Sequence, residues 1–198
     1  MTADEELLKE DYHENKRYES LKFSDYDLHR HTFENCHFSA CHFNEMSLNH
    51  VSFCSCVFQN SEFLLTKADN CTLNTVKFVN CKIAGLNFSE CNKFGFLPEF
   101  DHCRIESSVF CANNLKKTFF VNCLIKNTDF TYCDLRETDF SGTRFEKTVF
   151  QKCNLEKADF RTALNYEIDP FDNKMKNARF TLPEAQSFLG YLGLKIEM

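Results

Sequence analysis

Large apolar residues recur at every fifth position over most of this chain, and this spacing limits the possible folds more than any other feature. Stepping by five from Phe23 to Phe88 meets a large apolar residue at thirteen of fourteen positions, the exception being Ala68. The same step fits all twelve positions from Ile105 to Phe160. An α-helix repeats about every 3.6 residues and a β-strand at every second residue, so neither produces this pattern.

A second track, of small side chains, lies two residues before the first. From Cys103 to Ala158 it contains only Cys, Ser, Asn, Thr and Ala. Two inward positions in every five residues indicate a short extended piece followed by a corner. Identical residues also recur at a spacing of 20, as in Leu115, Leu135 and Leu155. Four units therefore make one coil, and stacked coils bury a continuous core that no single coil could bury alone.

Three short motifs make the chain similar to the pentapeptide-repeat family. They are Thr-Asp-Phe-Thr at 128–131, Thr-Asp-Phe-Ser at 138–141 and Ala-Asp-Phe-Arg at 158–161. The resemblance implies the fold of that family, an all-β, right-handed quadrilateral parallel β-helix.

The repeat is expected to fill residues 21–180, after an acidic N-terminal capping segment at 1–20. Tyr26 and His31 stand in the small-residue track of the first coil, which predicts a distorted end. The two runs of the five-residue step differ in phase by two residues, which predicts an interruption at about 93–100. A bulge or a small protruding loop would account for it.

Two further segments depart from the repeat towards the C-terminus. The step weakens after Phe160, and residues 167–174 are expected to form an outward loop. Residues 181–198 are expected to form a capping helix and strand. They begin with Thr-Leu-Pro-Glu, which has the spacing of a capping box with proline in the first turn. The helix should end at about Leu189, and the alternation at 194–196 predicts the strand.

Charge and hydropathy exclude several classes of protein. The net charge of −6 argues against direct binding to nucleic acid. No run of about 18 apolar residues exists, so no transmembrane helix is expected and no membrane partner is predicted. The N-terminus lacks the basic-then-apolar order of a secretion signal, and a cytoplasmic protein is expected.

The cysteines and histidines are expected to be structural. Ten of the twelve cysteines fall in the small-residue track, at spacings that are multiples of five, whereas metal motifs need gaps of about two to four residues. Only Cys54 and Cys111 lie outside it. Five histidines crowd the first two coils, with no two of them 20 residues apart. No phosphate-binding glycine loop, nucleophile elbow or HExxH motif is present, so no enzyme activity, catalytic residue, metal or cofactor is predicted.

The chain resembles the Qnr-type quinolone-resistance members of the family most in its mid-rod interruption and its C-terminal helix. Those members are dimeric rods that bind DNA gyrase or topoisomerase IV as mimics of duplex DNA. The resemblance implies a homodimer and a topoisomerase partner. The dimer interface would contain Phe188, Leu189, Leu192, Leu194 and Ile196. The candidate partner-binding residues are Asp129, Asp139, Asp159, Phe94, Phe96 and Leu97.

Charge distribution leaves a second hypothesis open. Residues 21–100 carry a net charge of −2 and residues 101–165 a net charge of +1, so a DNA mimic would have to concentrate acids on one face. Asp139 above Asp159 is the candidate, with Asp129 expected on the neighbouring face. The alternative is a structural or scaffold module that binds another protein through outward apolar residues. These are Val57, Leu64, Leu65, Val79, Phe119, Val121 and Leu124.

Overall fold

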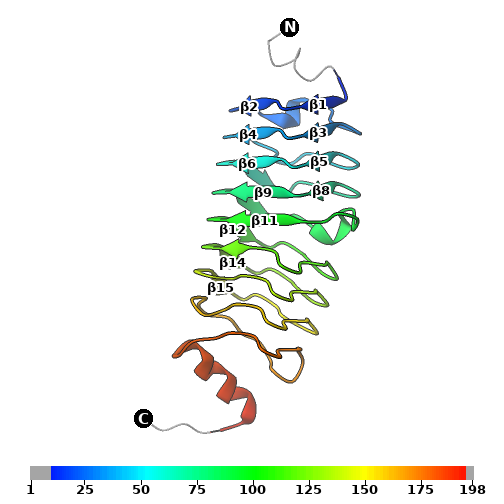
Figure 1. Ribbon diagram of the computed structural model, residues 1–198. Helices are drawn as coiled ribbons and strands as arrows, with labels where there is room; N and C mark the ends of the chain where they lie inside the picture. Colours follow the sequence, from blue (N-terminus) through cyan, green and yellow to red (C-terminus); the bar gives the residue numbers. More distant parts are fainter. Residues whose placement is uncertain (1–9, 195–198) are drawn as a thin grey trace.

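The computed structural model describes residues 10–194 of the 198, and they form one rod of stacked coils (Figure 1). The chain winds right-handed from the N-terminal to the C-terminal end of the rod. Each coil takes about 20 residues, because paired strands lie 20 or 22 residues apart in the chain, and each coil has four sides. All strand pairs are parallel, so the predicted parallel β-helix is confirmed.

Three of the four sides carry regular sheets. The first face consists of β1 (Tyr12–Glu14), β3 (Thr32–Glu34), β5 (Ser52–Cys54) and β8 (Thr72–Asn74). The second face consists of β2 (Arg17–Glu19), β4 (His37–Ser39), β6 (Val57–Gln59), β9 (Val76–Val79), β11 (Pro98–Asp101) and β13 (Phe120–Val121). The third face consists of β7 (Glu62–Leu64), β10 (Lys82–Ala84), β12 (Arg104–Glu106), β14 (Leu124–Lys126) and β15 (Arg144–Glu146).

The fourth face is held by single parallel bridges instead of strands. One ladder joins Asn87, Val109, Asp129 and Val149 on successive coils. Similar bridges continue the first and second faces into the C-terminal half, for example between Asp139 and Asp159. The backbone groups of every side are therefore paired from coil to coil, which a buried parallel structure requires.

Aromatic rings stack in columns through the centre of the rod. On the second face the column is Tyr18, Phe38, Phe58, Phe78, Phe100, Phe120, Phe140, Phe160 and Phe180. Phe110 and Phe130 stack in a second column with ring centroids 4.9 Å apart and planes at 8°. Rings of neighbouring columns meet edge to face, as Phe110 meets Phe120 at 83°. Both arrangements are favourable for aromatic quadrupoles, which explains the abundance of phenylalanine.

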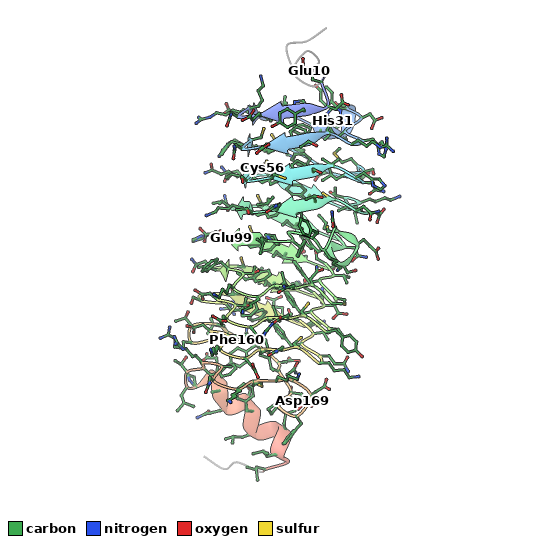
Figure 2. All side chains as sticks on the ribbon, turned by 45° about the vertical axis from the view of Figure 1, so that its right-hand side comes forward. Glu10, His31, Cys56, Glu99, Phe160 and Asp169 are labelled. Atoms are coloured by element: carbon green, nitrogen blue, oxygen red, sulfur yellow. The ribbon has the colours of Figure 1, made fainter. Side chains whose placement is uncertain are left out.

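The corners explain why the chain turns with so few glycines. At most corners a non-glycine residue adopts a left-handed backbone conformation, with φ between 47° and 65°. Asparagine is frequent there, as at Asn35, Asn60 and Asn80, and it tolerates this conformation better than most residues. Figure 2 shows the layers of side chains that result, with Glu99 on the outer surface.

The rod begins earlier than the sequence predicted. Strands β1 and β2 belong to a complete coil, so the assignment of 1–20 as a separate capping segment is wrong for residues 12–20. His13 and Tyr18 continue the five-residue step back from Phe23, and both are buried. A histidine at the first position of the step does not fit a pattern of large apolar residues, although its ring is buried in the same way. A short 3₁₀ helix, η1 (Phe23–Asp25), follows, and Tyr26 packs half-buried on Phe23.

The interruption lies where predicted and takes the place of a strand. After the 3₁₀ helix η2 (Phe88–Glu90), Asn92 still pairs with Thr72 in the preceding coil, an offset of 20. Pro98 pairs with Val76, an offset of 22. The two extra residues therefore lie in the loop at 93–97, which ends the first-face sheet at β8.

The C-terminal helix η3 (Glu184–Leu192) differs in detail from the prediction. It has 3₁₀ character, runs to Leu192, and ends at Gly193, which adopts the left-handed conformation with φ 66°. The capping box does not form, because the Thr181 hydroxyl donates to the carbonyl of Arg161 in the preceding coil. Leu194 lies outside any strand, and the rest of the strand expected at 194–196 falls outside the described residues.

Candidate protein-binding surface

The surface of the rod, and not an internal cleft, holds the candidate site. Within residues 10–194, no group of three or more His, Cys, Asp or Glu side chains is placed to hold a metal ion. No helix in the same range is long and apolar enough to cross a membrane. The ten cysteines of the small-residue track are buried, as predicted, and Cys54 and Cys111 are half-buried.

The predicted acidic residues do not form one acidic face. Asp139 and Asp159 lie on the second face in adjacent coils, as expected. Asp129 lies on the fourth face. That face is opposite, not neighbouring, because ten residues are half a coil. The guanidinium of Arg161, 2.7 Å from Asp159, holds the pKa of that carboxyl below its usual value.

Charges of both signs alternate along the second face as a whole. Its outward positions carry five acids and four bases: Glu19, Glu99, Asp101, Asp139 and Asp159 against Arg17, Lys77, Arg161 and Arg179. A DNA duplex carries a negative charge about every 1.7 Å, with no positive charges between. The second face therefore lacks the charge pattern of a duplex.

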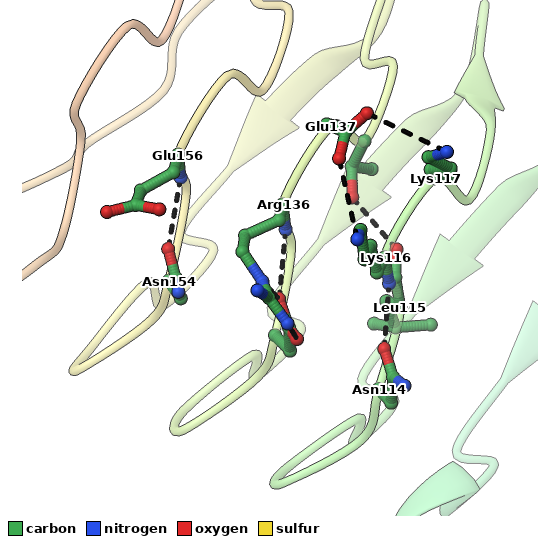
Figure 3. A network of polar contacts seen from close by, with 10 residues as sticks. Asn114, Leu115, Lys116, Lys117, Arg136, Glu137, Asn154 and Glu156 are labelled. Atoms are coloured by element: carbon green, nitrogen blue, oxygen red, sulfur yellow. Dashed lines mark hydrogen bonds and ion pairs between the residues drawn. The ribbon is translucent and has the colours of Figure 1, made fainter.

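The C-terminal half of the first face is richer in basic than in acidic residues. Figure 3 shows Lys116 and Lys117 on one coil reaching Glu137 on the next, at 3.6 and 3.9 Å. In the same region Arg136 pairs with Asp134, which lowers the pKa of that carboxyl. These pairs are solvent-exposed, so each contributes little to stability, but together they neutralise the acids that a mimic of DNA would present.

A shallow apolar hollow opens on the second face in the middle of the rod. Its volume is about 520 Å³, and Val79, Phe119 and Val121 supply its outward apolar side chains. The Phe119 side chain is 46% exposed although it sits on a rigid sheet among buried rings. Outward positions of a β-helix have no core to fill, so an exposed phenylalanine there is available to a partner.

Polar groups form the rim of this hollow. Lys77 Nζ lies 3.2 Å from Glu99 Oε2, which forms an ion pair across adjacent coils. His102 Nδ1 lies 2.7 Å from a carboxylate oxygen of Asp101. On the next coil beyond Phe119, Asp139 accepts hydrogen bonds from the Ser141 backbone N–H and hydroxyl. Glu99 is the only one of these three carboxylates with a lysine or arginine in an ion pair within residues 10–194.

The outward apolar residues predicted from the sequence all face away from the core, but they lie on two faces. Val57, like the residues of the hollow, belongs to the second face. Leu64 and Leu124 belong to the third face, and Leu65 lies at the corner that follows it. Of this set, three residues surround one hollow, which concentrates the candidate surface on the second face.

The three residues of the insertion loop that were predicted to contact a partner differ in their exposure. Phe94 is 87% exposed and Leu97 about half exposed, so both remain candidate partner contacts. Phe96 is buried, with only 4% exposed, and its ring meets Phe88 edge to face at 6.4 Å. The prediction that Phe96 contacts a partner is therefore wrong, because its side chain fills core space that the missing first-face strand would otherwise occupy.

The residues predicted to form the dimer interface also differ in their exposure. Phe188 is half-buried and packs on the end of its own rod, 4.8 Å from Phe180 and 5.9 Å from Tyr166. Leu189, Leu192 and Leu194 are exposed, and Ile196 lies outside the described residues.

One buried contact escaped the sequence-based predictions. His13 Nε2 lies 3.0 Å from His31 Nδ1, and the His13 ring stacks on Phe33 at 4.5 Å. The two histidines are 18 residues apart, so they do not belong to one 20-residue column. Extending the five-residue step back from Phe23 would have placed His13 inside the core.

Comparison with known proteins supports this description at the level of the fold. A family model for the pentapeptide repeat region matches residues 97–166. No curated protein sequence matches the chain. Two trypsin-treated forms of QnrB1, a plasmid-mediated fluoroquinolone resistance protein, superpose with TM-scores of 0.69 and 0.62 at 13% and 14% identity. These matches cover 94% of this chain in both cases, and 92% and 100% of the QnrB1 chains.

A third solved structure is similar over a slightly shorter length. HetL, a pentapeptide repeat protein involved in heterocyst differentiation regulation in the cyanobacterium Nostoc sp. strain PCC 7120, superposes with a TM-score of 0.56 at 10% identity. The match covers 84% of this chain and 85% of HetL. QnrB1 and HetL thus share this rod although they act in different processes, so the fold by itself does not specify a partner. In its five-residue repeat, its four-sided parallel solenoid and the family match over residues 97–166, this chain is similar to the pentapeptide-repeat proteins and shares their fold.

Proposed function

We propose that this chain is a non-enzymatic binding protein whose second face binds another protein. The observation that carries the proposal is the exposed Phe119, which lines the mid-rod hollow together with Val79 and Val121. The backbone beneath it is held by parallel pairing on both sides, from β11 to β13 and from Phe119 to Asp139. A rigid sheet that presents an aromatic side chain loses little conformational entropy when it binds a partner, which favours affinity.

A second candidate function is modulation of DNA gyrase or topoisomerase IV, with protection against quinolones or a topoisomerase-targeting toxin. The observation that favours it is the fold-level similarity to QnrB1 over nearly the whole of both chains. The charge pattern does not favour DNA mimicry as its mechanism, because Asp159 and Glu99 are paired with basic residues. If a topoisomerase is the partner, the apolar hollow is the more suitable contact.

A gyrase supercoiling assay, with and without a quinolone, tests both candidates. The wild-type protein is compared with Phe119→Asp, with Asp139→Asn combined with Asp159→Asn, and with the control Leu65→Asp, which changes an exposed apolar residue at a corner off the second face. Gyrase modulation by apolar docking predicts that only Phe119→Asp loses the effect, and that added salt changes it little.

The other outcomes separate the hypotheses. Loss of the effect in the double Asp variant but not in Phe119→Asp, together with strong salt dependence, would support DNA mimicry and contradict docking at the hollow. No effect of the wild-type protein on gyrase would reject the second candidate and leave a different protein partner.

A further inference from the structure

The carboxylates around Phe119 constrain the chemistry of the partner. In successive coils the outward position that contains Phe119 is occupied by Glu99, Phe119 and Asp139. In the neighbouring row the order is Val79, Asp101 and Val121. Acidic and apolar side chains therefore alternate from coil to coil along the rod, and the apolar pair Phe119 and Val121 follows the acidic pair Glu99 and Asp101. No other apolar residue in the hollow is as exposed as Phe119.

Two of these carboxylates have no strong cationic partner of their own. Within residues 10–194, the ion pair of the Asp101 carboxylate is with the imidazole of the adjacent His102, and the Asp139 carboxylate accepts hydrogen bonds from Ser141 and interacts with the Arg161 charge without forming an ion pair. On the next coil, the residue beside Asp139 in the same row is Asp159, and Arg161 neutralises its charge. Asp101 and Asp139 thus leave negative charge on either side of Phe119, in a region that also offers apolar contact.

From this arrangement we propose that the hollow binds an extended protein segment in which basic residues flank an apolar one. The apolar side chain would lie against Phe119 and Val121, and the Lys or Arg side chains would reach Asp101 on the preceding coil and Asp139 on the following one. This inference rests on the proposed function, because it names the partner chemistry of the same surface.

The spacing of the rod is compatible with such a segment. Adjacent coils lie about 4.8 Å apart and the two rows lie about 6.8 Å apart, so Asp101 and Asp139, two coils apart and in different rows, stand about 12 Å apart. In an extended segment, residues on one side recur about every 6.8 Å, which puts two basic residues that flank an apolar one about 14 Å apart. The flexible stems of lysine and arginine span this difference.

An NMR titration of the ¹⁵N-labelled full chain tests the inference. Three peptides share a central Leu in an otherwise Ser-rich segment and carry Lys, Gln or Glu at the positions two residues before and after it. The Lys peptide should shift the amide signals of Val79, Asp101 and Val121. It should bind about two- to thirtyfold more tightly than the Gln peptide, the range expected of two exposed ion pairs, and the Glu peptide should bind most weakly.

Matched variants separate the apolar contribution to peptide binding from the contribution of the charges. Phe119→Ala should weaken all three peptides, whereas Asp101→Asn combined with Asp139→Asn should abolish the difference between the Lys and Gln peptides. Asp129→Asn, on the opposite face, is the control and should change nothing. Equal binding of the Lys and Gln peptides through Phe119 would overturn this inference and leave the proposed function intact. Absence of shifts on the second face with every peptide would also overturn it, and where the wild-type protein acts on gyrase the Phe119→Asp comparison above tests the proposed function separately.

Discussion

The thiol of Cys133 donates a hydrogen bond to the backbone carbonyl of Phe110 in the preceding coil, with an Sγ–O distance of 3.0 Å. Hydroxyl groups do the same at equivalent positions: Thr138 donates to Leu115 at 2.9 Å, and Thr143 donates to Phe120. Positions in the small-residue track therefore favour side chains that are small and that can also donate a hydrogen bond to a buried carbonyl at the corner. Cysteine meets both demands, which explains its frequency here without a metal or a disulfide.

Replacing Cys133 tests the role of the donor. Cys133→Val keeps a similar volume but removes the donor, and we expect it to lower the free energy of unfolding by about 0.5–1 kcal/mol. Cys133→Thr retains a donor in a slot of the kind that Thr138 fills, and it should cost less. Urea denaturation measures both. Equal stability of the two variants would show that the slot selects only for size.

Thiol labelling reports on the whole track. Burial raises the pKa of the Cys91 and Cys153 thiols to about 12, so almost no thiolate is present at neutral pH. A thiol reagent at pH 8 should therefore modify about two of the twelve cysteines in the native protein, the half-buried Cys54 and Cys111. All twelve should react in denaturant. Rapid labelling of many native thiols would contradict the packing described above.

The aromatic column predicts a large cost for truncating one of its rings. Phe130 is fully buried between Phe110 and Phe150, at ring distances of 4.9 and 5.3 Å. Phe130→Ala should lower the free energy of unfolding by about 3–5 kcal/mol, because the adjacent coils are held in register and cannot close the cavity. Phe94→Ala, at an exposed site in the insertion loop, is the control and should have little effect. An unchanged urea midpoint for Phe130→Ala would contradict the assignment.

The His13–His31 contact predicts acid sensitivity at the N-terminal end. Burial lowers the pKa of both imidazoles, and the proximity of His31 lowers that of His13 further. An unfolded histidine titrates near pH 6.5, so below that pH the unfolded state binds more protons than the folded one. Stability should therefore be independent of these groups above about pH 6.5, should fall as the pH is lowered from there to the folded pKa values, and should level off below them. Nearby charged groups that modulate this effect are Glu10, Asp11, Lys16 and Asp27.

His13→Phe provides the test, because phenylalanine at this position would extend the column above Phe33. Urea denaturation should show that the wild-type protein loses stability between pH 7 and pH 5, and that the variant loses less. His37→Gln, at an outward position of the second face, is the matched control. If both variants keep the wild-type pH profile, the buried pair is not its source.

The exposed residues at the C-terminal end predict a homodimer. Leu189, Leu192 and Leu194 are exposed together, and a twofold contact between two C-terminal ends would bury them in one closed interface. Light scattering should give twice the chain mass of 23.2 kDa. Leu189→Asp combined with Leu192→Asp should give the monomer mass, and Leu65→Asp should leave the dimer intact. A monomer for the wild-type protein would contradict this prediction.

Much of this structure follows from the sequence because the repeat is local. A five-residue step determines which side chains point inward, so the columns through Phe120 and Phe130, the buried cysteines and the outward position of Phe119 could all be predicted. The phase shift located the insertion loop for the same reason. The sequence could also have predicted that Asp129 lies on the face opposite Asp139, since half of a 20-residue coil separates the two residues.

Only the tertiary structure decided which side chains neutralise or bury one another. The pairs Lys77–Glu99 and Lys116–Glu137 join different coils, and whether they form depends on rotamers that a repeat pattern does not specify. The burial of Phe96 depends on core space left where a strand is missing, which is a property of the neighbouring coils. The sequence alone determines the rod and its columns because these depend on short-range spacing, whereas the binding surface depends on contacts between residues about 20 positions apart.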